Sequence, residues 1–445
     1  MKDYVFILGS NWLLSIAELV VHLRDQGVSA VVKDFSRKAV IMSITDDLND
    51  RQIKDIQTAL GGCFKIGAAI FTYDHNTVLA AFPKKGKIIQ KDRRKLLGCP
   101  WVSEVWGTAR NQRIRFGIST YPMQNDTSID LKRFTIAMDE EVKERLVGLG
   151  AKKVDYFVYE GPDRRKADRP NTALWPQTLV KYGLLTSPNA EILMVFSQKT
   201  LYVGKTVAVY DSISQQHRDE TRPYVSAEVS TSPKICRTLL NLSGAKAGDT
   251  ILDPFCGTGT ILMEAALLGM DCVGIDTDLK AVEGSRSNMK WLENELGRKL
   301  KYEILRGDAR EAARLVQGKV DAAAFEPYLG PVCSGQPNKG EAEKAIKDLT
   351  ILYRDALSSI GLCLKTNGRV GMTLPVVNSK GGVVRIDLKN LLNNTGFDVI
   401  PFLPRDSITN RDLLDDESGL KTNRPRLPER KRGQIIQREV IMLSR

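Results

Sequence analysis

The sequence predicts an α/β protein whose carboxyl-terminal part is a doubly wound parallel sheet. From Gly248 onward, short apolar strands alternate strictly with helical segments, which is typical of a parallel sheet with helices on both faces. Several of these strands end at an acidic residue or turn. The composition, 42% hydrophobic and 27% charged, is that of a folded chain. Its 445 residues leave room for about three domains.

The strands expected in the parallel sheet are short and apolar, and helical segments separate them. They are residues 250–253, 272–276, 302–306, 321–325 and 370–374. Segments 399–403 and 435–443 are expected to close the sheet as an antiparallel pair. These elements define a last domain over residues 246–445.

Two α+β units are expected before it. Residues 1–80 alternate in a βαββαβ-like order typical of a ferredoxin-like domain, with a helix starting at Ser15, where Ser15 and Glu18 have the spacing of a capping box. Residues 81–210 form the second unit. Residues 211–245 contain Arg222-Pro223 and Ser232-Pro233 and are expected to be a linker that leads into a helix over 235–242.

The positive charge of the chain is concentrated in its middle. Residues 84–205 hold 23 basic and 13 acidic residues, a net charge of +10 out of +12. Such a block is typical of a module that binds a polyanion, and it favours RNA as the partner. Trp101 and Trp106 within it either stack on unpaired bases or belong to the core. The candidate RNA-binding residues are Lys91, Arg93, Arg94 and Lys95, and in the polar loop 161–170 Arg164, Arg165, Lys166 and Arg169.

Other classes of protein are disfavoured. The seven cysteines include no C-x-x-C pair and the three histidines are scattered, so we expect neither a disulfide framework nor a metal site. No stretch approaches 18 uninterrupted apolar residues, which argues against a membrane span. The apolar start over residues 4–21 contains Asn11 and Glu18. We therefore interpret it as folded structure of a cytoplasmic protein and not as a signal peptide.

The segment from Ile251 to Thr260 carries the strongest local signal. An apolar strand ends at Asp253, a turn with Gly257 and Gly259 follows, and an apolar helix begins at once. Ligands of open α/β sheets lie beyond the carboxyl ends of the strands, where such glycines allow close approach. The turn lacks the lysine of a phosphate-binding loop and the full G-x-G-x-x-G spacing. It therefore favours a nucleoside bearing an amino acid, such as S-adenosylmethionine.

Three further acidic turns follow the next three strands. Asp276 is suited to bind ribose hydroxyls, and Asp308 to accept a hydrogen bond from an adenine amino group. Glu326-Pro327-Tyr328 follows the fourth strand, where a target base would lie. Four such features at one edge indicate a ligand site.

The sequence D-P-F-C-G-T-G-T from Asp253, with the acidic strand end after it, resembles the Rossmann-fold methyltransferase domain of the tRNA guanosine-10 N2-methyltransferase family. Segments 7–19 and 217–223 are also similar to that family. The resemblance implies S-adenosylmethionine as cofactor, a tRNA substrate and a THUMP-like RNA-binding domain over residues 81–210. The cofactor-binding residues expected are Asp253, Phe255, Cys256, Gly257, Gly259, Thr260, Asp276, Thr277, Asp308, Ala309 and Glu326.

The catalytic turn departs from the family pattern. Members usually carry an acid or asparagine, then Pro-Pro and an aromatic residue, whereas this chain has Glu326-Pro327-Tyr328-Leu329. Either Leu329 occupies the aromatic position, or one proline is missing and Tyr328 remains the stacking ring. Methylation of an exocyclic amine needs acceptors for its hydrogens and a flat surface for the flipped base. We expect Glu326 and Pro327 to provide the acceptors and Tyr328 the surface.

Two other functions remain open. Cytosine C5 methylation needs a cysteine nucleophile near the fourth strand, and Cys333 is the candidate, although it lies seven residues beyond Glu326. Alternatively, the chain is an RNA-binding protein with a catalytically silent methyltransferase fold, since a fold alone does not establish activity.

Overall fold

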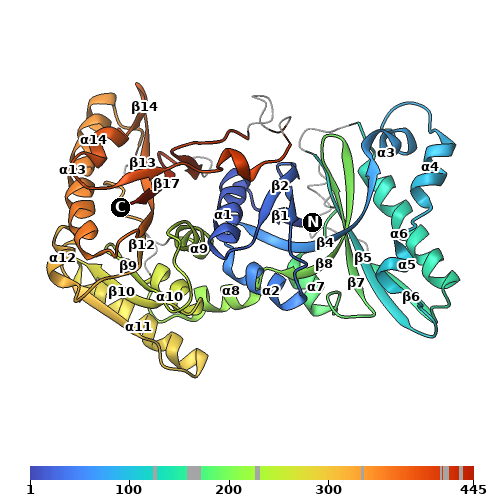
Figure 1. Ribbon diagram of the computed structural model, residues 1–445, viewed down its shortest axis with the longest axis horizontal. Helices are drawn as coiled ribbons and strands as arrows, with labels where there is room; N and C mark the ends of the chain where they lie inside the picture. The colour runs from blue at the N-terminus through green and yellow to red at the C-terminus, as the bar shows by residue number, and fades with distance from the viewer. Residues whose placement is uncertain are drawn as a thin grey trace.

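Two β-sheets lie side by side in the computed structural model, one built by the first 210 residues and one by the last 200 or so (Figure 1). The structure describes residues 1–123, 128–157, 172–225, 231–331, 335–410, 413, 420–429 and 434–445. The basic loop 161–170 and Cys333 lie outside the described residues.

The first sheet has eight strands in the order β2-β3-β1-β4-β8-β7-β5-β6. They are β1 (Lys2–Leu8), β2 (Ala30–Phe35), β3 (Ala39–Ile44), β4 (Cys63–Asp74), β5 (Arg113–Tyr121), β6 (Lys153–Phe157), β7 (Ala190–Phe196) and β8 (Thr200–Val209). The long strands β4 and β8 pair antiparallel, with Lys65 opposite Val209 and Asp74 opposite Thr200. Through this pairing, the strands on either side of the boundary expected at residue 80 form one continuous sheet.

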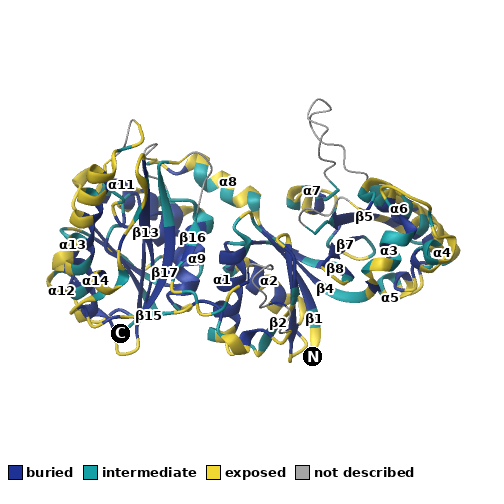
Figure 2. Ribbon diagram, turned by 90° about the horizontal axis from the view of Figure 1, so that it is seen from above, coloured by how far each residue is buried: buried dark blue, intermediate teal, exposed yellow. Residues whose placement is uncertain are grey.

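Helices cover this sheet in two groups. Helices α1 (Trp12–Asp25) and α2 (Asp50–Ala59) pack on its first half, and α3 (His75–Ala81), α4 (Gln90–Leu97), α5 (Val102–Trp106) and α6 (Leu131–Gly148) gather at its second half. The short helix α7 (Pro176–Lys181) precedes β7. The outer surfaces of α4 to α6 are exposed (Figure 2).

Of the two alternatives left open for the tryptophans of the basic block, the structure favours the core, most clearly for Trp101. Its side chain is only 1% exposed, and its indole nitrogen donates to the Tyr73 hydroxyl at 3.1 Å. Trp106 is half-buried, donates to the carbonyl of Pro188 at 2.9 Å and packs edge-on against Phe116. Both rings belong to the apolar core between α5 and the sheet, because burial of such large rings outweighs their value at the surface.

The second sheet follows the order β11-β10-β9-β12-β13-β17-β15 and confirms the doubly wound prediction. Its strands are β9 (Thr250–Asp253), β10 (Asp271–Asp276), β11 (Tyr302–Arg306), β12 (Ala322–Phe325), β13 (Arg369–Ser379), β14 (Gly382–Arg385), β15 (Asp398–Ile400), β16 (Leu427–Glu429) and β17 (Ile436–Ser444). Strands β9 to β13 are parallel, and β15 and β17 form the expected antiparallel pair. Strand β17 also pairs antiparallel with β13 and β16.

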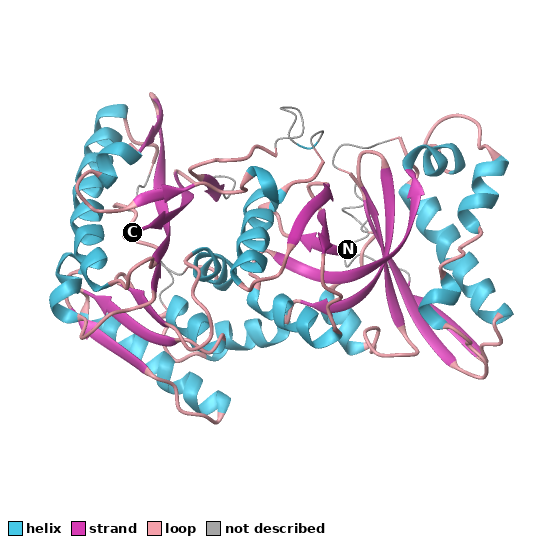
Figure 3. Ribbon diagram, viewed as in Figure 1, coloured by secondary structure: helices cyan, strands magenta, loops and turns pink. Residues whose placement is uncertain are grey.

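Helices cover both faces of this sheet, with α13 and α9 on opposite sides of β13 (Figure 3). The helices are α9 (Pro233–Leu242), α10 (Thr260–Leu267), α11 (Leu279–Leu296), α12 (Ala312–Leu315), α13 (Lys339–Cys363) and α14 (Leu388–Leu392), with 3-10 turns η2 (Ala309–Glu311) and η3 (Arg405–Ser407). Among the described residues, no helix combines the length and apolar character needed to cross a membrane.

The segment expected as a linker is largely helical. It contains α8 (Ser212–Thr221) and α9. Helix α9 is buried from Ile235 to its last residue, Leu242, and contacts α10, β12 and β13 on one side and α1 on the other. Its Arg237 donates to the carbonyl of Thr58 in α2 and to Glu264 in α10. Helix α9 is therefore part of the core that joins both halves of the molecule.

The capping box expected at Ser15 is not formed, because α1 begins earlier, at Trp12. Glu18 lies inside the helix and is fully buried. Its carboxylate accepts hydrogen bonds from the backbone amides of Gly61 and Gly62, both at 2.8 Å, and from the side-chain amide of Asn241 in α9 at 2.7 Å. Burial raises the pKa of Glu18, and these three donors oppose that rise. The glutamate thus ties α1 to the turn before β4 and to α9.

Replacing Glu18 with alanine leaves these three buried donors without their acceptor, and we expect a loss of about 3 kcal/mol in unfolding free energy. Urea unfolding followed by circular dichroism measures the change. The matched control is Glu104→Ala on the exposed surface of α5, which should lie within about 0.5 kcal/mol of the wild type. Equal midpoints for the two variants would contradict the structural role of Glu18.

Candidate active site at the carboxyl edge of the second sheet

Four acidic residues lie at one edge of the second sheet. Asp253 and Asp276 are the last residues of β9 and β10, Asp308 follows β11 after one glycine, and Glu326 directly follows β12. The four strands are adjacent and parallel in the order β11-β10-β9-β12, so their carboxyl ends meet at the same edge. The structure thus brings together the acids at the ends of four strands, where open α/β sheets bind ligands.

The loop after Asp253 is fixed by backbone hydrogen bonds to β10. The amide of Gly257 donates to the Asp276 carboxylate at 2.8 Å, and the amide of Cys256 donates to the carbonyl of Ile275 at 2.9 Å. Gly259 has a φ of +80°, and a Cβ there would clash with the Ser285 hydroxyl. A Cβ on Gly257 would meet no protein atom within 4 Å. The turn is therefore tight on the protein side and open in front of Gly257.

Asp253 is the most deeply buried of the four acids, with 1% of its surface exposed. Its carboxylate accepts a hydrogen bond from the amide of Phe255 at 3.0 Å, and no ion pair to it is found among the described residues. Burial raises the pKa of Asp253 well above its usual range, and the nearby carboxylates of Asp276 and Glu326 raise it further. A buried carboxylate without a cation favours a positively charged ligand group.

Asp276 and Asp308 already have partners on the protein. Besides Gly257, Asp276 accepts a hydrogen bond from the amide of Asp278 at 2.9 Å, and lone pairs remain for hydroxyl donors. The guanidinium of Arg310 forms an ion pair with Asp308 at 2.6 Å and holds the pKa of Asp308 below its usual range. Asp308 can accept an amino group only with lone pairs that Arg310 leaves. Thr277, beside Asp276, is exposed.

Other residues expected to bind the cofactor serve the core with their side chains. Cys256, Thr260 and Ala309 are buried. The thiol of Cys256 lies next to Gly274, and the hydroxyl of Thr260 accepts a hydrogen bond from Arg222 at 3.3 Å. Phe255 is half-buried, with its ring 5.7 Å from that of Phe325. These positions therefore shape the edge mainly through their backbone.

Glu326 lies at the centre of the fourth turn. Its carboxylate pairs with Arg438 of β17 at 2.6 Å and accepts a hydrogen bond from the Thr231 hydroxyl at 2.8 Å. Burial raises the pKa of Glu326, and Arg438 and Thr231 oppose that rise. Pro327 is buried, whereas the side chain of Tyr328 is 56% exposed and its carbonyl accepts a hydrogen bond from Tyr353. The turn thus presents a held carboxylate beside an accessible aromatic ring.

Three residues of the site were not predicted from the sequence. Thr231 and Arg438 contact Glu326 from distant parts of the chain. The third is Asn288 of α11, which accepts from the amide of Tyr224 and donates to the carbonyls of Tyr224 and Thr258, all at 2.9 Å. Asn288 ties the segment before α9 to the glycine turn. The one sequence feature that drew attention to the segment around Tyr224 was the neighbouring Arg222-Pro223.

The candidate RNA-binding residues are only partly described. Lys91, Arg93, Arg94 and Lys95 all lie on α4, where Arg93 is 5.3 Å from the ring centre of Phe82 and the other three are exposed. Arg164, Arg165, Lys166 and Arg169 lie outside the described residues. RNA binding by either group stays a prediction.

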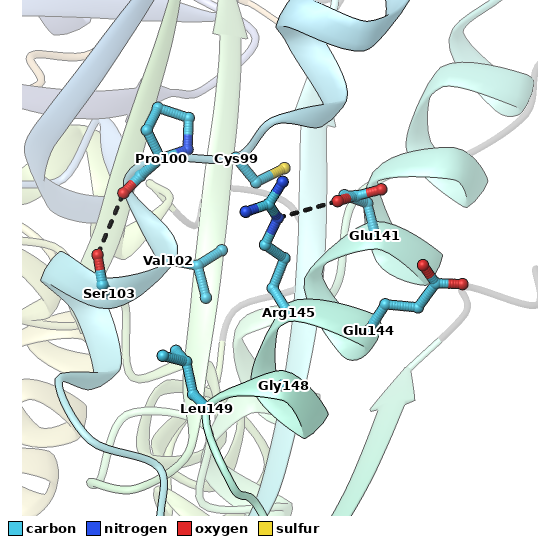
Figure 4. A pocket seen from close by; sticks show the side chains of 9 residues that line it. All are labelled: Cys99, Pro100, Val102, Ser103, Glu141, Glu144, Arg145, Gly148 and Leu149. Carbon is cyan, nitrogen blue, oxygen red and sulfur yellow. Dashed lines mark hydrogen bonds and ion pairs between the residues drawn. The ribbon is translucent and has the colours of Figure 1, made fainter.

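A surface cavity of about 490 Å³ lies between α5 and α6, away from the acidic edge (Figure 4). Its lining includes Cys99, Val102, Glu141, Glu144 and Arg145, with Arg145 bonded to Glu141 at 3.0 Å. The two acids and the apolar lining do not suit a phosphate. Within the described part of the chain, no group of three or more histidine, cysteine or acidic residues is arranged to hold a metal ion.

A known protein family matches the part of the chain that contains the acidic edge of the second sheet. The family model described as "RMKL-like, methyltransferase domain" matches residues 222–326, from Arg222 to Glu326. These residues are thus similar to a methyltransferase domain of the RMKL-like type. The matched residues include the glycine turn and all four acids of the edge, so the resemblance to a methyltransferase domain is confirmed.

Named relatives also match parts of the chain. The chain is 39% identical over 166 residues to the tRNA (guanine(10)-N2)-dimethyltransferase of Methanothermobacter thermautotrophicus, covering 37% of this chain and 45% of that protein. It is 31% identical over 176 residues to the enzyme of the same name from Methanocaldococcus jannaschii, covering 38% and 48%. The match thus spans less than half the length of either relative. The crystal structure of TrmN from Thermus thermophilus aligns over 100% of this chain and 99% of its own, with 17% identity and a TM-score of 0.48.

The unneutralised charge of Asp253 has a measurable cost. Because its pKa is raised in the folded state, ionisation favours the unfolded chain, and stability falls as the pH rises above the unfolded pKa of about 4. Asp253→Asn should therefore stabilise the ligand-free methyltransferase domain at neutral pH by roughly 1–2 kcal/mol, or about 2–8 °C in Tm. The gain should vanish near pH 4.

Asp308→Asn is the control with the opposite sign. Arg310 depresses the pKa of Asp308, so this carboxylate stabilises the fold above its unfolded pKa of about 4 and loses that effect as the pH falls. Its replacement should lower stability at neutral pH by at most about 1 kcal/mol, since the pair is partly exposed. A lower Tm for Asp253→Asn at neutral pH would contradict the analysis of Asp253.

Proposed function

We propose that this protein transfers a methyl group from S-adenosylmethionine to the exocyclic N2 of guanosine 10 in tRNA. The observation that carries the proposal is the placement of Glu326 and Tyr328 beside the buried Asp253 at one sheet edge, in a methyltransferase domain. The names of the two archaeal relatives supply the substrate, the base and the position. A tRNA substrate also agrees with the basic middle block and with the cytoplasmic location expected from the sequence.

The residues at the edge fit S-adenosylmethionine. A buried carboxylate suits the positively charged amino-acid part of this molecule, and Asp253 provides one that pairs with no cation in the described part of the chain. The open space in front of Gly257 admits close approach of a ligand to the backbone. Asp276 keeps acceptor capacity for ribose hydroxyls. When bound, S-adenosylmethionine supplies an electrophilic methyl group.

The fourth turn would hold the acceptor base. Glu326 accepts the hydrogens of the guanine amine, so that the nitrogen lone pair is directed away from the carboxylate and toward the methyl group. The exposed ring of Tyr328 provides the stacking surface for a flipped base. Because Pro327 is buried and Tyr328 projects outward, the geometry supports the alignment in which one proline is missing and Tyr328 keeps the aromatic role.

Incubation of the full chain with unmodified tRNA and S-adenosylmethionine, followed by mass-spectrometric mapping of the nucleosides, tests the proposal. We expect N2-methylguanosine or N2,N2-dimethylguanosine at position 10. Methyl incorporation at a cytosine C5 would instead revive the reaction through Cys333. Cofactor binding without incorporation into any RNA would identify a catalytically silent fold.

Glu326→Ala should lower the transfer rate by about 100-fold or more, because the amine loses its acceptor. Calorimetric titration with S-adenosylmethionine should show nearly unchanged affinity. Glu326→Gln is the matched variant, since it preserves side-chain volume but replaces one acceptor oxygen by a donor. Full activity in both variants would remove Glu326 from the proposal.

Asp253→Asn should bind S-adenosylmethionine at least tenfold more weakly than the wild type, because the charge that favours a cationic ligand is gone. Calorimetry at pH 7 measures the difference. Asp308→Asn should lose less affinity, since Arg310 already occupies that carboxylate. Equal losses in the two variants would argue against a special role of Asp253.

A further inference from the structure

We propose that Arg438 is the positioning residue of Glu326: with Thr231 it orients the carboxylate that receives the guanine amine, and its positive charge favours the ionised form of that carboxylate. This inference rests on the proposed function and deepens it. It assigns a role in the active site to the last strand of the sheet, which lies outside the matched residues 222–326.

The geometry places one donor on each oxygen of Glu326. The Nε of Arg438 lies 2.6 Å from Oε1, and the hydroxyl of Thr231 lies 2.8 Å from Oε2. Each carboxylate oxygen has two lone pairs, so one on each oxygen remains for the amine. The side chains of Glu326 and Arg438 are only 10% and 14% exposed, so water competes little for these bonds. Two fixed donors therefore restrict rotation of a side chain that is one methylene longer than aspartate.

The backbone of Arg438 is itself held firmly. Arg438 is the third residue of β17, where it is opposite Pro375 of β13 on one side and Glu429 of β16 on the other. Its guanidinium also reaches the Glu429 carboxylate at 3.4 Å. Antiparallel pairing on both sides of β17 thus fixes the distance from Arg438 to the end of β12.

The charges around Glu326 make the arginine necessary. Besides Arg438, the titratable groups that face it are the carboxylates of Asp253 and Glu429, the Tyr353 hydroxyl of α13 and the Cys236 thiol of α9. Among these described groups Arg438 is the only cation, and burial alone favours the neutral acid. Protonation would turn one oxygen of Glu326 into a donor and weaken the group as an acceptor for the amine. Arg438 opposes that outcome, whereas Glu429 promotes it.

The pH dependence of transfer separates positioning from simple structural support. Activity should rise with pH as Glu326 ionises. Arg438→Met should move this acid limb of kcat upward by roughly one pH unit or more, with KM for tRNA within about twofold of the wild type. Arg438→Lys keeps the positive charge but loses the planar guanidinium group. Relative to Arg438→Met, it should return the acid limb most of the way to its wild-type pH and restore part of kcat.

Glu429→Gln is the matched variant with the opposite expectation. It removes a carboxylate that competes for Arg438, so the acid limb of the kcat profile should move to lower pH while the maximal rate stays high. The double variant Arg438→Met/Glu429→Gln should lie between the two single variants. An equal loss of activity at every pH in Arg438→Met, with the limb unmoved and Tm lowered, would overturn the proposal.

A titration independent of activity distinguishes failure of this inference from failure of the proposed function. The carboxyl signal of Glu326 in protein labelled with ¹³C-glutamate is assigned by its absence in Glu326→Gln. Its midpoint should rise in Arg438→Met and fall in Glu429→Gln. If the wild type methylates no tRNA, the proposed function fails, yet this titration still tests the pairing. A titration midpoint of Glu326 that is unchanged in both variants would refute the role of Arg438.

Discussion

The site depends on a collection of like charges that the fold forces together. Parallel pairing of β11, β10, β9 and β12 brings the ends of four strands to one edge, and each end carries an acid. Besides its burial, the carboxylates of Asp276 and Glu326 raise the pKa of the most buried acid, Asp253, which has no described cation to relieve it. Electrostatics of this kind cost stability in the ligand-free protein, and such costs concentrate at functional sites. The edge is stable enough to persist because apolar cores on both faces of the sheet support it.

The four acids are treated differently by their surroundings. Backbone amides hold Asp276, Arg310 holds Asp308, and Arg438 with Thr231 holds Glu326. Asp253 alone relies on a single amide. A carboxylate is thus an uncompensated charge at the end of β9 and an oriented hydrogen-bond acceptor at the ends of the other three strands. Environment, not residue identity, decides which role each can take.

Much of the second sheet and its acidic edge could be predicted from the sequence, because the signals are local. The strands 250–253 and 302–306 were predicted to the residue, since each is an apolar run that ends at a turn. Contacts between distant segments escaped prediction. Thr231 precedes Glu326 by 95 residues, and nothing in the local sequence around either one links them. The capping box at Ser15 failed for a similar reason, because Glu18 makes its hydrogen bonds with Gly61, Gly62 and Asn241 instead. Charge counting likewise located the basic block but could not tell that Trp101 is buried.

Helix α9 has a consequence for how the two halves of the chain depend on each other. It contacts α1 on one side and β12 and β13 on the other, and Arg237 adds bonds to α2 and α10. A catalytic fragment that begins at residue 246 would expose the apolar surface of β12 and β13, and a fragment that ends at residue 210 would uncover α1. Neither half can be excised cleanly at the boundaries suggested by the prolines. Evolutionary exchange of this methyltransferase domain between proteins would therefore have to carry the helix along, together with a partner surface able to receive it.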